Sequence, residues 1–208
     1  NKRGPMIELR VLELLCARFC HEMVSPVGAV SNGVELLDED DPDFVREAMT
    51  LIGQSARTAS RRLQFYRFAY GTTPVAGNMR PRELLMGLLE GGKVSAEWGE
   101  GVSALTPEWQ RIACNLAVIA GEALPRGGRI VIQATPGAPA GVAVEAIGDP
   151  VLVNPDMVAA LSGSVPPSEL TSRTIHGYVT AKFAEQLGGS CGLRESGPGR
   201  VVFSSQLR

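Results

Sequence analysis

The residues of this chain best suited to proton or group transfer near neutral pH are its histidines, and there are only two of them, His21 and His176. An imidazole ring acts as acid or base close to pH 7 and can form covalent intermediates. His21 is directly followed by Glu22, whose carboxylate can orient or deprotonate the ring. His21 and Glu22 are therefore the first candidates for a catalytic site.

The segment around His21 has the hydrophobic pattern of a long helix. Apolar or small residues recur in steps of three and four and form an a/d heptad seam: Leu9, Leu12, Cys16, Phe19, Met23, Pro26, Val30, Gly33 and Leu37. A proline inside a helix removes a backbone hydrogen bond and costs about 3 kcal/mol unless a kink is required. Pro26 therefore indicates a specific local shape five residues after His21.

With Leu9 at position a, His21 falls at position f and points away from the seam. The same face carries small or polar residues, namely Arg18, Ser25, Gly28 and Asn32. Such a face leaves room for another protein to approach closely. The alternative interpretation is a solvent-exposed helical histidine without a role.

A second amphipathic helix is predicted after the acidic stretch 38–42, which supplies N-cap oxygens and a proline for the first helical position. Its apolar positions run from Val45 to Ala69. At about 1.5 Å per residue both helices reach roughly 40–45 Å, and two such helices cannot bury wide apolar faces against each other alone. We therefore expect a homodimer in which two hairpins form a four-helix bundle.

The composition of the chain changes near residue 71. Residues 1–70 contain 4 Gly and 3 Pro, whereas residues 71–208 contain 20 Gly and 11 Pro. In the second half, helices are expected at 79–89, 106–124, 173–187 and from 154, and strands at 93–98, 129–135, 141–147 and 200–206. The fold class is thus α+β: a helical hairpin at 6–70, then an α/β sandwich at 75–208 with a mixed sheet covered by helices on one face.

The overall composition excludes several classes of protein. The 20 Lys and Arg nearly balance the 22 Asp and Glu, which argues against a nucleic-acid binder. No apolar run approaches the ~20 residues of a membrane span, so we expect a cytoplasmic protein. The four cysteines fit neither a disulfide scaffold nor a zinc site.

The stretch from Phe19 to Val27, with His21-Glu22 followed by Ser25-Pro26, resembles the phospho-acceptor box of sensor histidine kinases, H-E-x-x-[ST]-P. In those kinases the box lies on the first helix of a dimeric hairpin. The resemblance implies that the imidazole of His21 carries a phosphoryl group and that Glu22 assists its transfer.

The second half resembles the ATP-binding domain of the same kinases, but without its ligand residues. Ile119 stands where an asparagine would hold Mg²⁺, and Ala146 where an aspartate would bind adenine. Pro150, Thr174 and His176 replace glycines of the nucleotide boxes. Such a site should bind ATP poorly. His176 is then interpreted as a histidine at a helix start beside a vestigial site.

A kinase-like dimer that keeps the phospho-acceptor box and loses the ATP site resembles the ChpT-type histidine phosphotransferases of alphaproteobacteria, and the resemblance covers residues 8–207. It implies that a phosphoryl group passes from the receiver aspartate of a hybrid kinase through the histidine to response regulators of the cell cycle. No cofactor is expected in this chain, because Mg²⁺ would be held by the partner receiver domain. The residues expected to contact receivers are Arg18, Ser25, Pro26, Gly28 and Ala29, with possible help from Arg57, Arg61 and Arg62.

Two other functions stay open. The first alternative is an active ATP-dependent sensor histidine kinase with a divergent nucleotide site. The second is a non-enzymatic dimeric adaptor in which His21 is incidental. Binding of Mg-ATP is expected only for the kinase. Full biological output after replacement of His21 is expected only for the adaptor.

Overall fold

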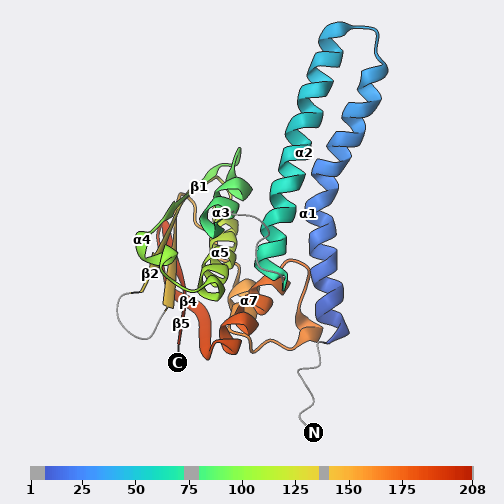
Figure 1. The fold of residues 1–208 in the computed structure, drawn as a ribbon. Coiled ribbons are helices and arrows are strands. Elements are labelled where there is room, and N and C mark those ends of the chain that lie inside the picture. The colour runs from blue at the N-terminus through green and yellow to red at the C-terminus, as the bar shows by residue number, and fades with distance from the viewer. Residues whose placement is uncertain (1–7, 73–79, 136–140, 208) are drawn as a thin grey trace.

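The computed structural model describes residues 8–72, 80–135 and 141–207. Two long antiparallel helices, α1 (Leu9–Glu35) and α2 (Pro42–Tyr70), form the predicted hairpin (Figure 1). A short turn, η1 (Leu36–Asp38), joins them. The side chain of Asp41 accepts a hydrogen bond of 2.9 Å from the backbone of Asp43 and Pro42 begins α2, which confirms the predicted helix start.

The seam between α1 and α2 agrees with the predicted positions only from Phe19 onward, where Pro26 and Gly33 are buried. Leu9 and Leu12 are 69% and 52% exposed. Their burial in the expected four-helix bundle stays a prediction, and within the single chain another face of this part of α1 contacts the second domain. There Leu14 packs with Leu170 and other residues of that domain.

The second domain is a five-stranded mixed sheet with strand order β1-β2-β3-β5-β4. Its strands are β1 (Val94–Trp98), β2 (Gly128–Ala134), β3 (Gly141–Ile147), β4 (Gly189–Gly197) and β5 (Arg200–Leu207). β1 and β2 are parallel, and the other neighbours are antiparallel. The helices are α3 (Pro81–Leu89), α4 (Glu100–Ser103), α5 (Pro107–Glu122), α6 (Pro155–Leu161), η2 (Pro167–Glu169) and α7 (Ile175–Gln186).

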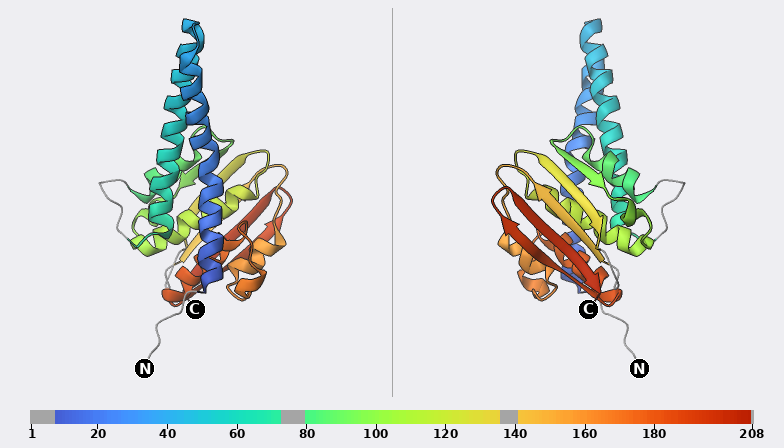
Figure 2. Two further views of the ribbon diagram at one scale, coloured as in Figure 1. Left: turned by 90° about the vertical axis from the view of Figure 1, so that its right-hand side faces the viewer. Right: turned by 90° about the vertical axis from the view of Figure 1, so that its left-hand side faces the viewer.

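The longer helices cover one face of this sheet, and Figure 2 shows the opposite face open. In Figure 1, α3 and α5 lie between the sheet and α2. This arrangement confirms the predicted α+β fold, with a helical hairpin followed by an α/β sandwich. Strand β4 was not predicted because its segment is rich in glycine and charge, and only one of its edges pairs in the sheet.

The hairpin and the second domain share one buried core. Phe65 and Phe68, near the end of α2, belong to the same cluster as Leu85 of α3 and Ile112 of α5. The last turns of α2 are therefore part of the packing of the second domain. The predicted domain starts, residues 6 and 75, lie outside the described residues.

Candidate functional site

His21 lies in the middle of α1 and is exposed, as its heptad position predicted. The helix around it presents mostly exposed side chains on that face, among them Val24 and Ser25. A partner can therefore reach the imidazole without a rearrangement of the hairpin.

Glu22 faces away from His21, toward α2. Its carboxylate lies 3.6 Å from Nη1 of Arg62, and the same nitrogen donates a hydrogen bond to the backbone carbonyl of Glu22. Burial and the nearby carboxylate of Glu22 raise the pKa of Tyr66 to about 12. Among the described residues no hydrogen bond joins Glu22 to His21, so the predicted assistance of Glu22 in transfer stays a prediction.

The residues predicted to contact receivers follow His21 along α1. Ser25 is exposed, and Gly28 and Ala29 are half-buried. A Cβ added to Gly28 would meet no atom within 4 Å, so this part of the helix borders open space. Pro26 is buried, as its position in the seam predicted, and its contact with receivers stays a prediction.

A groove of about 250 Å³ runs beside this segment between α1 and α2. Its lining is mostly small and polar: Ser25, Pro26, Ala29, Gln54, Ser55, Thr58 and Arg62. The face of small and polar residues predicted on α1 thus continues onto α2. Of the three arginines considered on α2, only Arg62 lines this groove.

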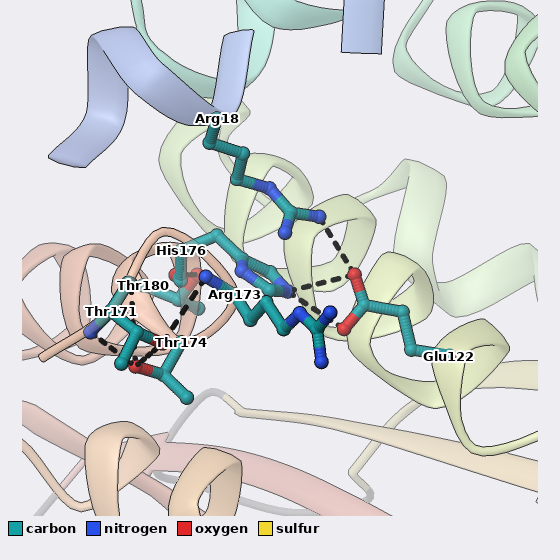
Figure 3. A network of polar contacts seen from close by, with 7 residues as sticks. All are labelled: Arg18, Glu122, Thr171, Arg173, Thr174, His176 and Thr180. Atoms are coloured by element: carbon teal, nitrogen blue, oxygen red, sulfur yellow. Dashed lines mark hydrogen bonds and ion pairs between the residues drawn. The ribbon is translucent and has the colours of Figure 1, made fainter. Parts of the chain in front are cut away.

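Arg18 does not stand on the free surface that its position suggested. Its side chain is 12% exposed, and its guanidinium forms an ion pair of 2.7 Å with Glu122 at the end of α5. Figure 3 shows Arg18 reaching from α1 toward the second domain. The charge of Arg18 is thus paired within the chain, and its predicted contact with receivers stays a prediction.

Glu122 also contacts His176, and the three side chains form one network, the Arg18–Glu122–His176 clasp (Figure 3). Nε2 of His176 lies 3.1 Å from the carboxylate of Glu122. Burial lowers the pKa of His176, although Glu122 acts in the opposite direction. Burial alone would raise the pKa of Glu122, but the hydrogen bond from His176 and the charges of His176 and Arg18 lower it. The sequence placed His176 at a helix start but gave no signal for its partner.

The positions that lost the nucleotide residues are buried. Ile119 and Ala146 are 2% and 0% exposed, on α5 and β3. A cavity beside Ile119 measures about 30 Å³, and it is lined by Ile119, Glu122, Ala123, Leu152, Val153, Asn154, Met157 and Phe203. Ligand pockets in proteins usually measure roughly 300–1,000 Å³, so this cavity is of the size of a water molecule.

Two further observations concern the described residues only. No three side chains of His, Cys, Asp or Glu in this part of the chain come together in a way that could hold a metal ion. None of the described helices has the length and apolar character needed to cross a membrane.

Comparisons with known proteins agree with the motifs. Residues 80–198 match the family model described as the histidine phosphotransferase C-terminal domain. Over 200 residues the chain is 32% identical to the protein phosphotransferase ChpT of Brucella abortus (strain 2308), covering 93% of both chains. It also resembles the 1.7 Å structure of a bacterial phosphotransferase, with 28% identity, a TM-score of 0.75 and coverage of 97% of this chain and 98% of the other.

Proposed function

Because the chain belongs to the histidine phosphotransferase family, as its motifs predicted, we propose that His21 is the residue that carries the phosphoryl group. The observation that carries this proposal is the contrast between the two histidines of the chain. His21 is exposed on α1, whereas His176 is 0% exposed and bonded to Glu122. Only an exposed imidazole can meet a phosphoryl group that another protein holds.

The donor in this proposal is the aspartyl phosphate of a receiver domain in a hybrid kinase. A ring nitrogen of neutral His21 attacks the phosphorus atom, a P–N bond forms, and the P–O bond to the aspartate breaks. The reverse steps pass the group to the receiver aspartate of a response regulator. Such transfers depend mainly on positioning and on charge neutralisation, and Mg²⁺ in the receiver's own acidic pocket would supply the latter.

We further propose that the relay needs no ATP. The support is the loss of nucleotide residues at Ile119 and Ala146, together with the cavity of about 30 Å³ beside Ile119. A nucleoside triphosphate would have to displace buried side chains of the core to enter, and such overpacking is costly.

The same proposal includes a homodimer built on the hairpin. A groove of about 480 Å³ on α1 and α2 is lined by Val27, Val30, Ala56, Ala59, Ser60, Leu63, Gln64 and Arg67. Val27 and Leu63 are 50% and 56% exposed. Exposed apolar side chains along two neighbouring helices are suited to a second hairpin, and a four-helix bundle would cover them.

The surface formed by Ser25, Gly28 and Ala29 would then receive the partner receivers, since it lies within two turns of His21 and borders open space. Location in the cytoplasm, expected from the lack of a long apolar run, and control of the cell cycle, implied by the family resemblance, stay predictions.

The experiment uses two incubations of the purified chain. One contains a receiver domain that carries a labelled phosphoryl group, with Mg²⁺, and the other contains labelled ATP and Mg²⁺ alone. We expect label on the chain only from the receiver. Label from ATP would instead establish the histidine kinase, and the absence of label in both would leave the adaptor.

A further inference from the structure

The proline of the phospho-acceptor box leaves one backbone group of α1 without its helical partner. In an α-helix each N–H donates to the carbonyl four residues earlier, and proline has no N–H. The carbonyl that Pro26 leaves free is that of Glu22, the residue next to His21. Buried or half-buried carbonyls need another donor, because an unmade hydrogen bond is costly away from water.

Arg62 of α2 supplies that donor. Its Nη1 atom donates to the freed carbonyl of Glu22, forty residues away in the sequence. The same nitrogen lies 3.6 Å from the carboxylate of Glu22. A guanidinium carries five N–H donors in a planar fork, so one side chain can serve both acceptors at once. Arg62 and Glu22 are both partly shielded from solvent, which strengthens the contact.

Neighbouring arginines on α2 do not share this role. Arg61 forms an ion pair of 2.7 Å with Glu90, at the start of the loop after α3. Arg57 is exposed, and within the described ranges it forms no ion pair. The contact with Glu22 is therefore specific to Arg62 and not a general property of a basic helix face.

We propose that Arg62 is a positioning residue for phosphoryl transfer through His21. Arg62 takes the place of the backbone hydrogen bond that Pro26 removes, and it holds the carboxylate of Glu22 toward α2. The turn of α1 that carries His21 is thereby fixed in direction although Pro26 interrupts the helical hydrogen bonds. Arg62 acts through Glu22 and touches no reacting atom. This inference rests on the proposed function of His21.

The test compares single-turnover transfer from a phosphorylated receiver to the chain, with the saturating rate and the half-saturating receiver concentration measured separately. We expect Arg62→Met to lower the saturating rate about tenfold with little change in half-saturation, since misplacement of a reacting group mainly affects the transfer step. Arg62→Lys, which keeps the charge and a donor, should recover part of the rate. Arg46→Met, at an arginine near the start of α2 whose side chain is 74% exposed, is the matched control and should transfer like the unchanged chain.

A double-mutant cycle with Pro26 tests the backbone part of the inference. In Pro26→Ala the alanine N–H can bond the Glu22 carbonyl again, so the loss caused by Arg62→Met should shrink from about tenfold to about threefold in that background. An equal loss in both backgrounds, or unchanged transfer in Arg62→Met, would overturn the inference.

The same series of variants includes one control for folding and one for the proposed function of His21. Far-ultraviolet circular dichroism of each variant establishes that the helices are intact, and Arg62→Gln replaces Arg62→Met if the latter does not fold. If His21→Ala abolishes transfer while Arg62→Met or its substitute does not reduce it, the inference about Arg62 alone is wrong. If His21→Ala transfers normally, the proposed function is wrong and this inference is overturned with it.

Discussion

The guanidinium of Arg18 lies 2.7 Å from the carboxylate of Glu122, and this ion pair joins the helix that carries His21 to the second domain. Glu122 in turn accepts a hydrogen bond from the buried ring of His176. The clasp therefore couples the orientation of α1 to the start of α7 (Figure 3). Through this contact the second domain supports the helix that carries His21.

Removal of Glu122 should weaken the fold measurably. Glu122→Ala leaves the nearly buried Arg18 without its counter-charge and the ring of His176 without its partner, and such losses cost about 1–3 kcal/mol. Urea unfolding should show this decrease in the free energy of unfolding. Glu47→Ala, at an exposed position of α2, is the control and should change it by less than about 0.5 kcal/mol. Equal stability of the two variants would contradict the clasp.

The stability of the chain should depend on pH through His176. Its pKa in the folded state lies below the ordinary value of 6.5 because the ring is buried. Between that lowered pKa and about 6.5 the unfolded chain binds more protons than the folded one. The contribution of the His176 ring to the free energy of unfolding is therefore complete above pH 6.5 and is lost as the pH falls. Thermal unfolding from pH 7.5 to 5 measures the slope.

Replacement of His176 allows the pH effect to be assigned. His176→Gln should flatten the slope between pH 6.5 and 5, because it removes the buried ring. A slope that stays the same in His176→Gln would refute the assignment.

Two glycines of α1 should respond in opposite directions to alanine. At Gly28 a Cβ meets nothing within 4 Å, so Gly28→Ala should stabilise the helix by about 0.5–1 kcal/mol. At Gly33 a Cβ would lie 2.6 Å from Cγ1 of Ile52 on α2, and Gly33→Ala should destabilise the chain by roughly 1–3 kcal/mol. Thermal midpoints of the two variants give the signs, and a shift in the same direction for both would disprove the close approach of α1 and α2 at Gly33.

The proposed dimer depends on the apolar groove of the hairpin. Val27→Glu combined with Leu63→Glu places charges on two residues that line this groove, so the variant should be monomeric. Leu152→Glu, at an equally exposed leucine of the second domain, should leave the dimer intact. Light scattering coupled to size-exclusion chromatography measures both masses. A groove variant that keeps the mass of the unchanged dimer would place the interface elsewhere.

Local signals explain which parts of the fold could be predicted. The N-cap and proline at Asp41-Pro42 determine the start of a single helix. The small residues that face α2 determine how closely two neighbouring helices approach. The structure confirms both. The ion pair of Arg18 was not predicted because its partner, Glu122, is 104 residues away and no local pattern encodes that distance. The contact of Arg62 had a signal in the sequence: Pro26 requires a new donor for the carbonyl of Glu22.

The role of His21 is tested by phosphoryl transfer from one labelled receiver domain, with Mg²⁺, to the unchanged chain and to His21→Ala. Thermal unfolding of His21→Ala should match that of the unchanged chain, since the ring is exposed. We predict that the unchanged chain and His176→Gln become labelled with an acid-labile phosphoryl group and that His21→Ala does not. Labelling of His21→Ala at the rate of the unchanged chain would show that another residue carries the phosphoryl group.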